Sequence, residues 1–266
     1  MVDKFLLYEK DGPVVTLTMN QAAVRNIVTG NSAVDEFLAA FAKIENDDSV
    51  RAVIITGAGT AFSAGGNINE MKRQIGVPPA ELRQEYRNGI QRLPRALYNL
   101  EVPTIAAVNG PAIGAGCDIA CMCDIRIAAE SATFAESFVK LGIVAGDGGA
   151  WLLPRIVGAS KAAEMSFTGD GISSSEALAC GLVSRVVPGG ELMSEARMLA
   201  GRIAANSGPA VRMTKRLIRE GMHLSLDSAL ELAASFQVLA HKTSEHAVAV
   251  DAFLDKRAGR DTKRKD

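Results

Sequence analysis

The chain has 266 residues, enough for one large domain with a small appendage. Its 29 basic and 30 acidic residues leave a formal charge of −1, and only 5% of the residues are aromatic. This composition argues against nucleic-acid binding, which favours a basic surface and exposed rings. The N-terminal residues MVDKFLLYEK are too charged for a signal peptide or a membrane span, so we expect a cytoplasmic protein without membrane partners.

The first elements are expected to form a hairpin followed by a helix. Residues 5–19 contain two strand-like runs separated by Asp11, Gly12 and Pro13, and the second run alternates as a half-buried strand does. Residues 32–46 have apolar side chains at helical spacing, and Ser32 is a candidate N-cap.

The middle of the chain predicts a parallel sheet. Residues 50–57 are so apolar that both faces of the strand should be covered, as in a sheet with crossover helices. Residues 69–95 are polar and contain Gly76, Pro78 and Pro79, which favours a mobile helical flap; a solvated helix pair is the alternative. Further strands are expected at 103–108 and 125–128.

The last third is expected to be mostly helical. Short helices at 160–167 and 174–179 and a strand at 182–187 precede four helices, at 191–205, 209–220, 226–241 and 244–257. The helix at 226–241 has a wide apolar face, including Leu230, Phe236 and Val238, that requires burial.

The cysteines and histidines do not indicate a metal or nucleophile site. The chain contains four cysteines, Cys117, Cys121, Cys123 and Cys180. The first three lie in an apolar segment without a histidine, so we expect small buried side chains rather than a zinc site. The three histidines come late and adjoin no serine or cysteine motif, so no catalytic triad is indicated.

Two stretches of small residues each follow a predicted strand. They are Thr60–Met71, TAFSAGGNINEM, and Asn109–Ala128, NGPAIGAGCDIACMCDIRIA. Small side chains let a ligand approach the backbone. The second stretch includes an expected helix at Cys117–Cys123, whose first amides have no internal acceptor. Such donors favour a developing negative charge, for example on the oxygen of a thioester enolate. The alternative is that small residues only allow close packing of a helix on a sheet.

The two stretches together resemble the loops AF-x-AG-x-(D/N)-(I/L) and NG-x-A-x-G-(G/A)-G-C-(E/D)-(I/L)-A of the enoyl-CoA hydratase/isomerase family, the crotonases. The resemblance extends from about Val14 to Arg257. It implies an α/β fold, a crotonase-like spiral of stacked ββα turns. It also implies an acyl-CoA-binding core over residues 1–200 and a C-terminal helical region over 201–266 that forms trimers or dimers of trimers.

The resemblance also implies roles for individual residues. The amides of Ala64 and Ala115 would form an oxyanion hole, and Phe253 and Lys256 would reach coenzyme A on a neighbouring subunit. The other implied substrate contacts are Ala23, Val24, Arg25, Ala61, Phe62, Gly65, Gly66, Asn67, Ile68, Gly114 and Phe138. For Ala23–Arg25 an exposed turn is an equal alternative. No cofactor is implied, because coenzyme A is part of the substrate.

The acids depart from the family pattern. A typical hydratase of the family has two carboxylates, which would fall on Asp118 and on Phe138, and a phenyl ring cannot transfer a proton. Glu136 and Asp147 are nearby in sequence and are candidate replacements. Asp147 has an alternative role as a cap of a helix at 149–153, and Asp118 could instead complement the dipole of its helix.

The leading hypothesis is therefore an enoyl-CoA hydratase-like lyase of fatty acid metabolism that uses Asp118 and Asp147. Isomerisation and thioester hydrolysis remain open, because they require a similar oxyanion. A noncatalytic acyl-CoA binder that has lost the acid pair is the third hypothesis.

Overall fold

A computed structural model describes residues 4–262, with side chains as far as Arg257. Contacts divide the chain into two compact units, one that ends at Gly201 and one that begins at Arg202. Each unit is described by itself.

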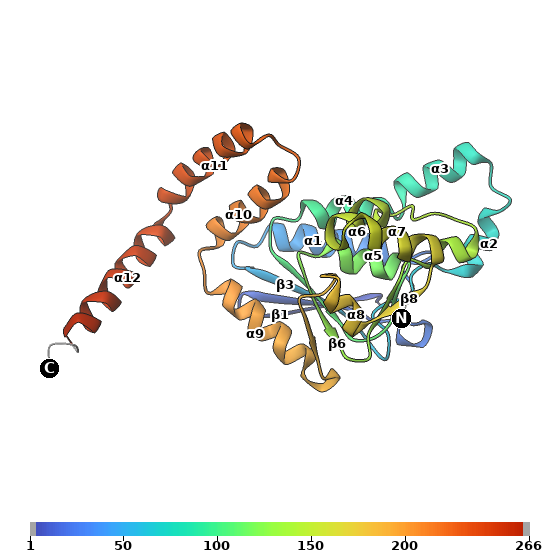
Figure 1. Ribbon diagram of the computed structural model, residues 1–266, viewed down its shortest axis with the longest axis horizontal. Helices are drawn as coiled ribbons and strands as arrows, with labels where there is room; N and C mark the ends of the chain where they lie inside the picture. The colour runs from blue at the N-terminus through green and yellow to red at the C-terminus, as the bar shows by residue number, and fades with distance from the viewer. Residues whose placement is uncertain (1–3, 263–266) are drawn as a thin grey trace. The chain divides into compact units, whose positions relative to one another are not determined.

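The first unit is built on a six-stranded sheet in the order β1-β2-β3-β4-β6-β9 (Figure 1). Its strands are β1 (Leu6–Asp11), β2 (Val14–Met19), β3 (Ala52–Gly57), β4 (Thr104–Val108), β6 (Ile125–Ala129) and β9 (Arg185–Val187). β1 and β2 are antiparallel, and every other neighbouring pair is parallel. The structure thus confirms the N-terminal hairpin and the parallel sheet. The last strand begins at Arg185 rather than at Leu182, because its pairing with β6 covers only Arg185–Val187.

A second, three-stranded sheet was not expected from the sequence. It consists of β5 (Ala112–Ile113), β7 (Thr133–Ala135) and β8 (Gly171–Ser173), with β7 in the middle. β5 pairs parallel to β7, and β7 pairs antiparallel to β8. Strands of two or three residues are too short to produce an alternating pattern, so the sequence contains no signal for them.

Several helices of this unit lie on one side of the large sheet in Figure 1. They are α1 (Ala33–Glu45), α4 (Arg92–Asn99), α5 (Ala115–Met122), α6 (Gly149–Val157) and α7 (Ala159–Thr168). Consecutive members of this group contact each other, and their apolar faces join the buried core. The remaining helices of the unit are α2 (Ile68–Gln74), α3 (Pro79–Asn88), α8 (Ser174–Ala179) and most of α9 (Leu192–Ala204), with 3-10 turns η1 (Ala22–Val24), η2 (Ser137–Leu141) and η3 (Gly189–Glu191).

The predicted cap of α1 is wrong in detail. Ser32 makes no capping bond and instead donates to Glu36, whereas the Asn31 side chain accepts from the Ala33 amide at 3.0 Å. The Asn31 side chain, one residue earlier, therefore satisfies the first amide of the helix.

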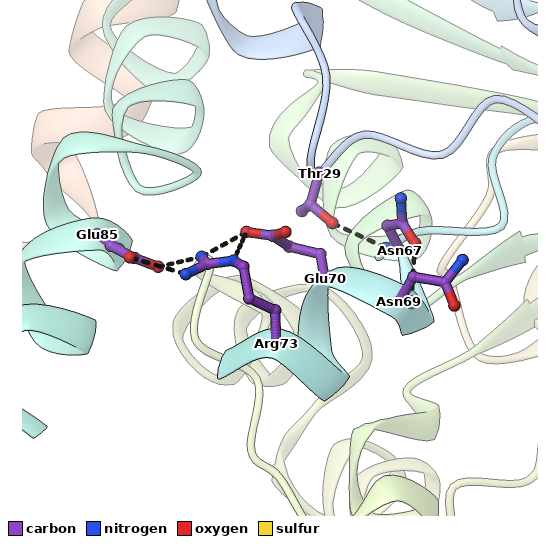
Figure 2. Close-up of polar contacts among 6 residues, drawn as sticks. All are labelled: Thr29, Asn67, Asn69, Glu70, Arg73 and Glu85. Atoms are coloured by element: carbon purple, nitrogen blue, oxygen red, sulfur yellow. Dashed lines mark hydrogen bonds and ion pairs between the residues drawn. The ribbon is translucent and has the colours of Figure 1, made fainter. Parts of the chain in front are cut away.

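The segment expected to be a flap consists of three helices with different environments. α2 and α3 have no buried residue, and Arg73 of α2 forms ion pairs with Glu70 and with Glu85 of α3, both at 2.6 Å (Figure 2). α4 differs, because Leu93 and Leu97 are fully buried. The flap prediction is therefore wrong for the part from Arg92 onward, which belongs to the core.

The second unit contains the end of the chain. Its helices are α10 (Gly208–Gly221), α11 (Leu226–His241) and α12 (Ser244–Thr262), and α11 contacts both others. Within this single chain no residue of Leu226–His241 is fully buried, and Leu230, Val238 and Leu239 are each about 60% exposed. An apolar face of this kind is typical of a subunit interface, and the predicted trimerisation role of this region stays a prediction.

Asn26 connects the turn after β2 to the loop after β3. It is fully buried with a left-handed backbone (φ 56°). Its side-chain nitrogen Nδ2 donates to the carbonyl oxygens of Ala58, Ala61 and Phe62 at 2.9–3.2 Å, and its side-chain oxygen Oδ1 accepts from the backbone amide of Gln21. One side chain therefore holds this loop in place.

We expect Asn26→Ala to destabilise the protein by about 3 kcal/mol, because it leaves several buried backbone groups without a partner. Urea unfolding at equilibrium measures this. Asn46→Ala, which removes an exposed asparagine bond to Ala42, is the matched control and should cost less than about 1 kcal/mol. Equal effects of the two variants would contradict this role for Asn26.

Candidate active site

The two small-residue stretches meet at one edge of the sheet. They follow β3 and β4, which are parallel neighbours, so their carboxyl ends lie side by side. Ser63 forms a parallel bridge with Ala112 of β5, and the Ile113 amide donates to the Ser63 carbonyl at 3.0 Å. The Phe62 and Ser63 amides both donate to the Pro111 carbonyl at 3.1 Å. These bonds fix the backbone of one loop against the other.

Glycine is required where the two backbones touch. A Cβ on Gly65, whose φ is +81°, would collide with the Ile113 carbonyl and would lie 3.1 Å from the Ala115 nitrogen. A Cβ on Gly116 would collide with the Ser63 carbonyl. The close approach therefore brings the residues around Gly65 next to the first turn of α5.

Two amides at this junction have no acceptor within residues 4–262, those of Gly66 and Ala115. Ala115 is the first residue of α5, where an amide has no partner inside the helix. The amide of Ala64 differs, because it donates to the Arg25 carbonyl at 2.8 Å. In contrast to the expectation from the resemblance, Ala64 is therefore not free to donate to a ligand, and Gly66 is.

The other expected contact residues of the first unit have varied environments. Ala23 and Val24 lie in the exposed turn η1, and Arg25 follows it with a left-handed backbone and an exposed side chain. Ala61 and Phe62 are buried in the core, and their predicted contact with the substrate stays a prediction.

Asn67 and Ile68 begin α2. The Asn67 amide donates to Thr29 Oγ1 at 2.8 Å, and its side chain caps the helix by accepting from the Asn69 amide (Figure 2). Ile68 is 58% exposed. Asn67 therefore fixes the start of α2 directly after the free Gly66 amide.

Three carboxyl groups are buried together beside the first turn of α5. Asp118 is 0% exposed, Glu136 2% and Asp147 4%. Apart from one another, the neighbouring Cys117 thiol and the backbone amide of Asp147, both oxygens of Asp118, both of Glu136 and Oδ1 of Asp147 have no hydrogen-bond partner among the described residues. A Cβ on Gly149 would collide with the Asp118 carboxylate, which places that group against the start of α6. The alternative role of Asp147 as a cap of α6 is wrong, because the N-cap is Gly148 and, among the described residues, no α6 amide donates to the Asp147 side chain.

Burial shifts the proton affinity of all three acids upward. Burial, and then the charges of Asp147 and Glu136, raise the pKa of Asp118 well above its ordinary value. Burial raises the pKa of Glu136 to about 7, against hydrogen bonds from Asp118 and Cys117 that lower it. Burial also raises the pKa of Asp147, opposed by a hydrogen bond from Asp118. Apart from the backbone amide of Asp147, the donors to these acids are neighbouring acids and a thiol, so a proton held on one of the acids links the cluster.

Phe138 and Tyr86 border this cluster. The tip of the Phe138 ring lies beside Gly114, 3.5 Å from where a Cβ would be. Burial, and then the charge of Asp147, raise the pKa of Tyr86. Tyr86 also lines a cavity of about 750 Å³, which reaches the Asp147 loop at Gly146. The other residues that line this cavity are Pro79, Leu82, Arg83, Arg87, Gln91, Gly142, Ile143 and Val144.

Comparison with known proteins settles the family. The model of the enoyl-CoA hydratase/isomerase family matches residues 9–261. This chain belongs to the enoyl-CoA hydratase/isomerase family. Its crotonase fold agrees with the solved structure of an enoyl-CoA hydratase from Bacillus anthracis, with a TM-score of 0.88, 32% identity, and 95% and 97% of the two chains covered.

Relatives that catalyse different reactions have similar sequence identity to this chain. The short-chain-enoyl-CoA hydratase of Clostridium acetobutylicum is 39% identical over 255 residues, 95% of each chain. The 1,2-epoxyphenylacetyl-CoA isomerase of Escherichia coli is 34% identical over 259 residues, 96% of this chain and 97% of that protein. Similarity therefore identifies the family but does not choose between hydration and isomerisation.

The remaining predictions concern the C-terminal unit, the cysteines and membrane-spanning segments. Phe253, 69% exposed, and Lys256 lie on α12 in the C-terminal unit. Cys117, Cys121 and Cys123 are buried as expected, and no group of three potential metal ligands occurs in the part of the chain that the structure describes. No helix within residues 4–262 is both long enough and apolar enough to cross a bilayer.

Sequence reasoning missed two features of the site. It placed the first free amide at Ala64 rather than Gly66, because the Arg25 carbonyl that occupies the Ala64 amide is distant in sequence. It also left Glu136 only as an alternative, because an acid next to an apolar strand gives no sign that it is buried.

We expect the stability of this crotonase to fall as pH rises from about 4.5 to about 7. In that window the unfolded Glu136 carboxyl ionises while the folded one, whose pKa is raised to about 7, keeps its proton. The loss amounts to roughly 3 kcal/mol at about 1.4 kcal/mol per pKa unit. Glu136→Gln should therefore be more stable than the wild type at pH 8 and similar to it at pH 4.

Chemical unfolding at the two pH values measures this difference. Glu130→Gln is the matched control, since Glu130 is exposed on the same segment, between β6 and β7. If Glu136→Gln shows the same pH dependence as the wild type, the folded Glu136 has no raised pKa.

Proposed function

We propose that this chain is an acyl-CoA enzyme that stabilises an enolate-like oxyanion with the amides of Gly66 and Ala115 and that it hydrates enoyl-CoA thioesters. The observation that supports it is the meeting of two unpartnered amides with a buried carboxyl, Asp118, one turn further along the helix that begins at Ala115. The family and the enoyl-CoA hydratases among its relatives favour the same chemistry.

The oxyanion hole acts on the thioester carbonyl. As the acyl group becomes an enolate, negative charge gathers on the carbonyl oxygen, and two fixed N–H donors stabilise that charge more than the neutral carbonyl. The amide of Ala115 adds the positive end of α5. Both donors are held by the glycine contacts between the loops, so they need no rearrangement during the reaction.

The acids supply proton transfer. Asp118 is held by a helix whose first residue is an oxyanion donor, and Asp147 faces it from the loop before α6. In hydration, one carboxylate takes a proton from water as the oxygen attacks the double bond, and a carboxyl gives a proton to the neighbouring carbon. Phe138 supplies an apolar wall where many relatives place an acid.

Isomerisation is the second candidate function. A buried cluster whose acids exchange protons suits the removal of a proton from one carbon and its return to another, and one relative is an isomerase. Thioester hydrolysis has no further support from the site.

Turnover of matched substrates tests the function. Crotonyl-CoA should give 3-hydroxybutyryl-CoA if the protein is a hydratase, whereas a 3-enoyl-CoA should give the 2-enoyl isomer without adding water if it is an isomerase. If calorimetry shows that acyl-CoA binds but hydration, isomerisation and thioester hydrolysis are all absent, the protein is better explained as a noncatalytic acyl-CoA binder.

We expect Ala115→Pro to lower turnover on the order of a hundredfold or more, because it deletes one oxyanion donor. Proline is tolerated at the first position of a helix, so the fold should persist. Ala159→Pro is the matched control, because Ala159 is the first residue of α7 and also follows a glycine N-cap. Steady-state kinetics compare the two, and full activity of a folded Ala115→Pro protein would refute the assignment.

We further propose that coenzyme A is bound partly by Phe253 and Lys256 of a neighbouring subunit in a trimer or a dimer of trimers. The exposed apolar side chains of α11 and α12 support an assembly. Ala23, Val24 and Arg25, exposed beside the first loop, are proposed contacts on the same subunit.

We expect Lys256→Glu to weaken acyl-CoA binding, more strongly at low than at high salt, and to leave the assembly unchanged. Calorimetry and light scattering measure the two properties. Lys242→Glu, an exposed lysine that follows α11, is the control and should bind normally. A monomer, or unchanged binding by Lys256→Glu, would count against the proposal.

A further inference from the structure

Glu136 has a buried carboxyl group that the oxyanion chemistry does not by itself explain. It follows β7 directly and is 2% exposed, and neither oxygen has a hydrogen-bond partner among the described residues other than the neighbouring Asp118 carboxyl and Cys117 thiol. An ionised carboxylate in such a place is strongly disfavoured unless a proton is held on it or beside it. The surroundings of Glu136 must therefore supply that proton.

The backbone brings Glu136 to the oxyanion loop. β5 and β7 pair in parallel, with Ile113 opposite Ala135, and the Gly114 amide donates to the Ala135 carbonyl at 2.8 Å. Glu136 thus follows the end of β7, next to the place where the segment after β5 turns through Gly114 into α5. This register holds its carboxyl near the first turn of that helix, independently of any titration.

The titratable groups that face Glu136 come from three elements. Asp118, Cys117 and, behind them, Cys121 lie on α5, Asp147 lies before α6, and Tyr86 of α3 faces Asp147. No lysine or arginine of the described residues contributes to the shifts of the three acids. Without a cation, the three acids cannot all be ionised.

Asp118 is the central member of the cluster. It interacts with both Asp147 and Glu136, whereas Glu136 interacts by hydrogen bonding only with Asp118 and Cys117. Burial raises the pKa of Asp118 and so favours its protonated form, and a protonated acid cannot accept a proton from water or carbon. A buried Asp118 therefore needs a neighbour that removes its proton before it acts as a base.

We propose that Glu136 is this neighbour: it exchanges a proton with Asp118 and so sets whether Asp118 acts as a base. The proposal rests on the proposed function and adds a residue to it. Glu136 acts through Asp118 rather than on the substrate, so it is a positioning residue and not a catalytic one.

The exchange balances without any further reactant. The O–H bond of Asp118 breaks, an O–H bond forms on Glu136, and the negative charge moves from Glu136 to Asp118. Asp118 then takes a proton from the substrate or its attacking water. When Asp118 returns a proton at the end of the reaction, Glu136 gives back the one it holds, and the cluster regains its original state.

The pH dependence of kcat/KM tests this exchange. Glu136 accepts a proton only when it is ionised, so the wild type should gain activity as pH rises through about 7. Glu136→Gln should lose this rise and fall about tenfold or more in kcat/KM at pH 8. Glu136→Asp should restore part of the rise, and the exposed control Glu130→Gln should leave the profile unchanged. A purely structural role would lower the rate at every pH without removing the rise.

Infrared titration of the substrate-free protein gives a readout that needs no turnover. The carboxyl C=O band should lose intensity as pH rises through about 7 in the wild type, and this component should be absent in Glu136→Gln. In Asp118→Asn, where the exchange partner is gone, the component should titrate at a different pH.

The outcomes separate the two proposals. An infrared titration in Glu136→Gln that equals the wild type, or a kcat/KM profile in which the rise persists, overturns the role of Glu136. The wild type could instead turn over none of the acyl-CoA substrates while its infrared titration behaves as expected. That result counts against the proposed function and supports the proton exchange.

Discussion

The close contact between two backbones, at Gly65 and Gly116, is the constraint on which the rest of the site depends. A side chain at either position would collide with a carbonyl oxygen of the other loop. The contact, together with the bridge from Ser63 to Ala112, fixes the Gly66 and Ala115 amides without any side chain between them. A site made from main-chain donors is rigid, because its geometry depends on the sheet rather than on rotamers.

The same geometry explains the acids. A helix that begins at Ala115 must place Asp118 one turn later, and parallel pairing of β5 with β7 must place Glu136 beside that turn. Asp147 is brought in by α6, whose Gly149 packs on the Asp118 carboxylate. Burial of three acids without a cation opposes stability, and the fold tolerates this cost where the carboxyls share protons.

Patterns over long segments were predicted correctly from the sequence. The hairpin at 5–19, the buried parallel strand predicted at 50–57 and found at 52–57, and the helix predicted at 117–123 and found at 115–122 follow from hydrophobic patterns and turn residues, which are local properties. The two spaced motifs also identified the family. Short elements were missed: β5, β7 and β8 have two or three residues each, and their pairing alone makes them strands.

By itself, the sequence determined the family, the α/β fold and the two loops that meet at the site, because motif spacing and hydrophobic periodicity are recorded along the chain. Only the tertiary structure decided which amides are free and which acids are buried together. The Arg25 carbonyl that occupies the Ala64 amide is 39 residues away from it along the chain, and Asp118, Glu136 and Asp147 come from three different elements. Hydrogen bonding and burial at these positions depend on contacts between distant segments, and no local pattern of residues records such contacts.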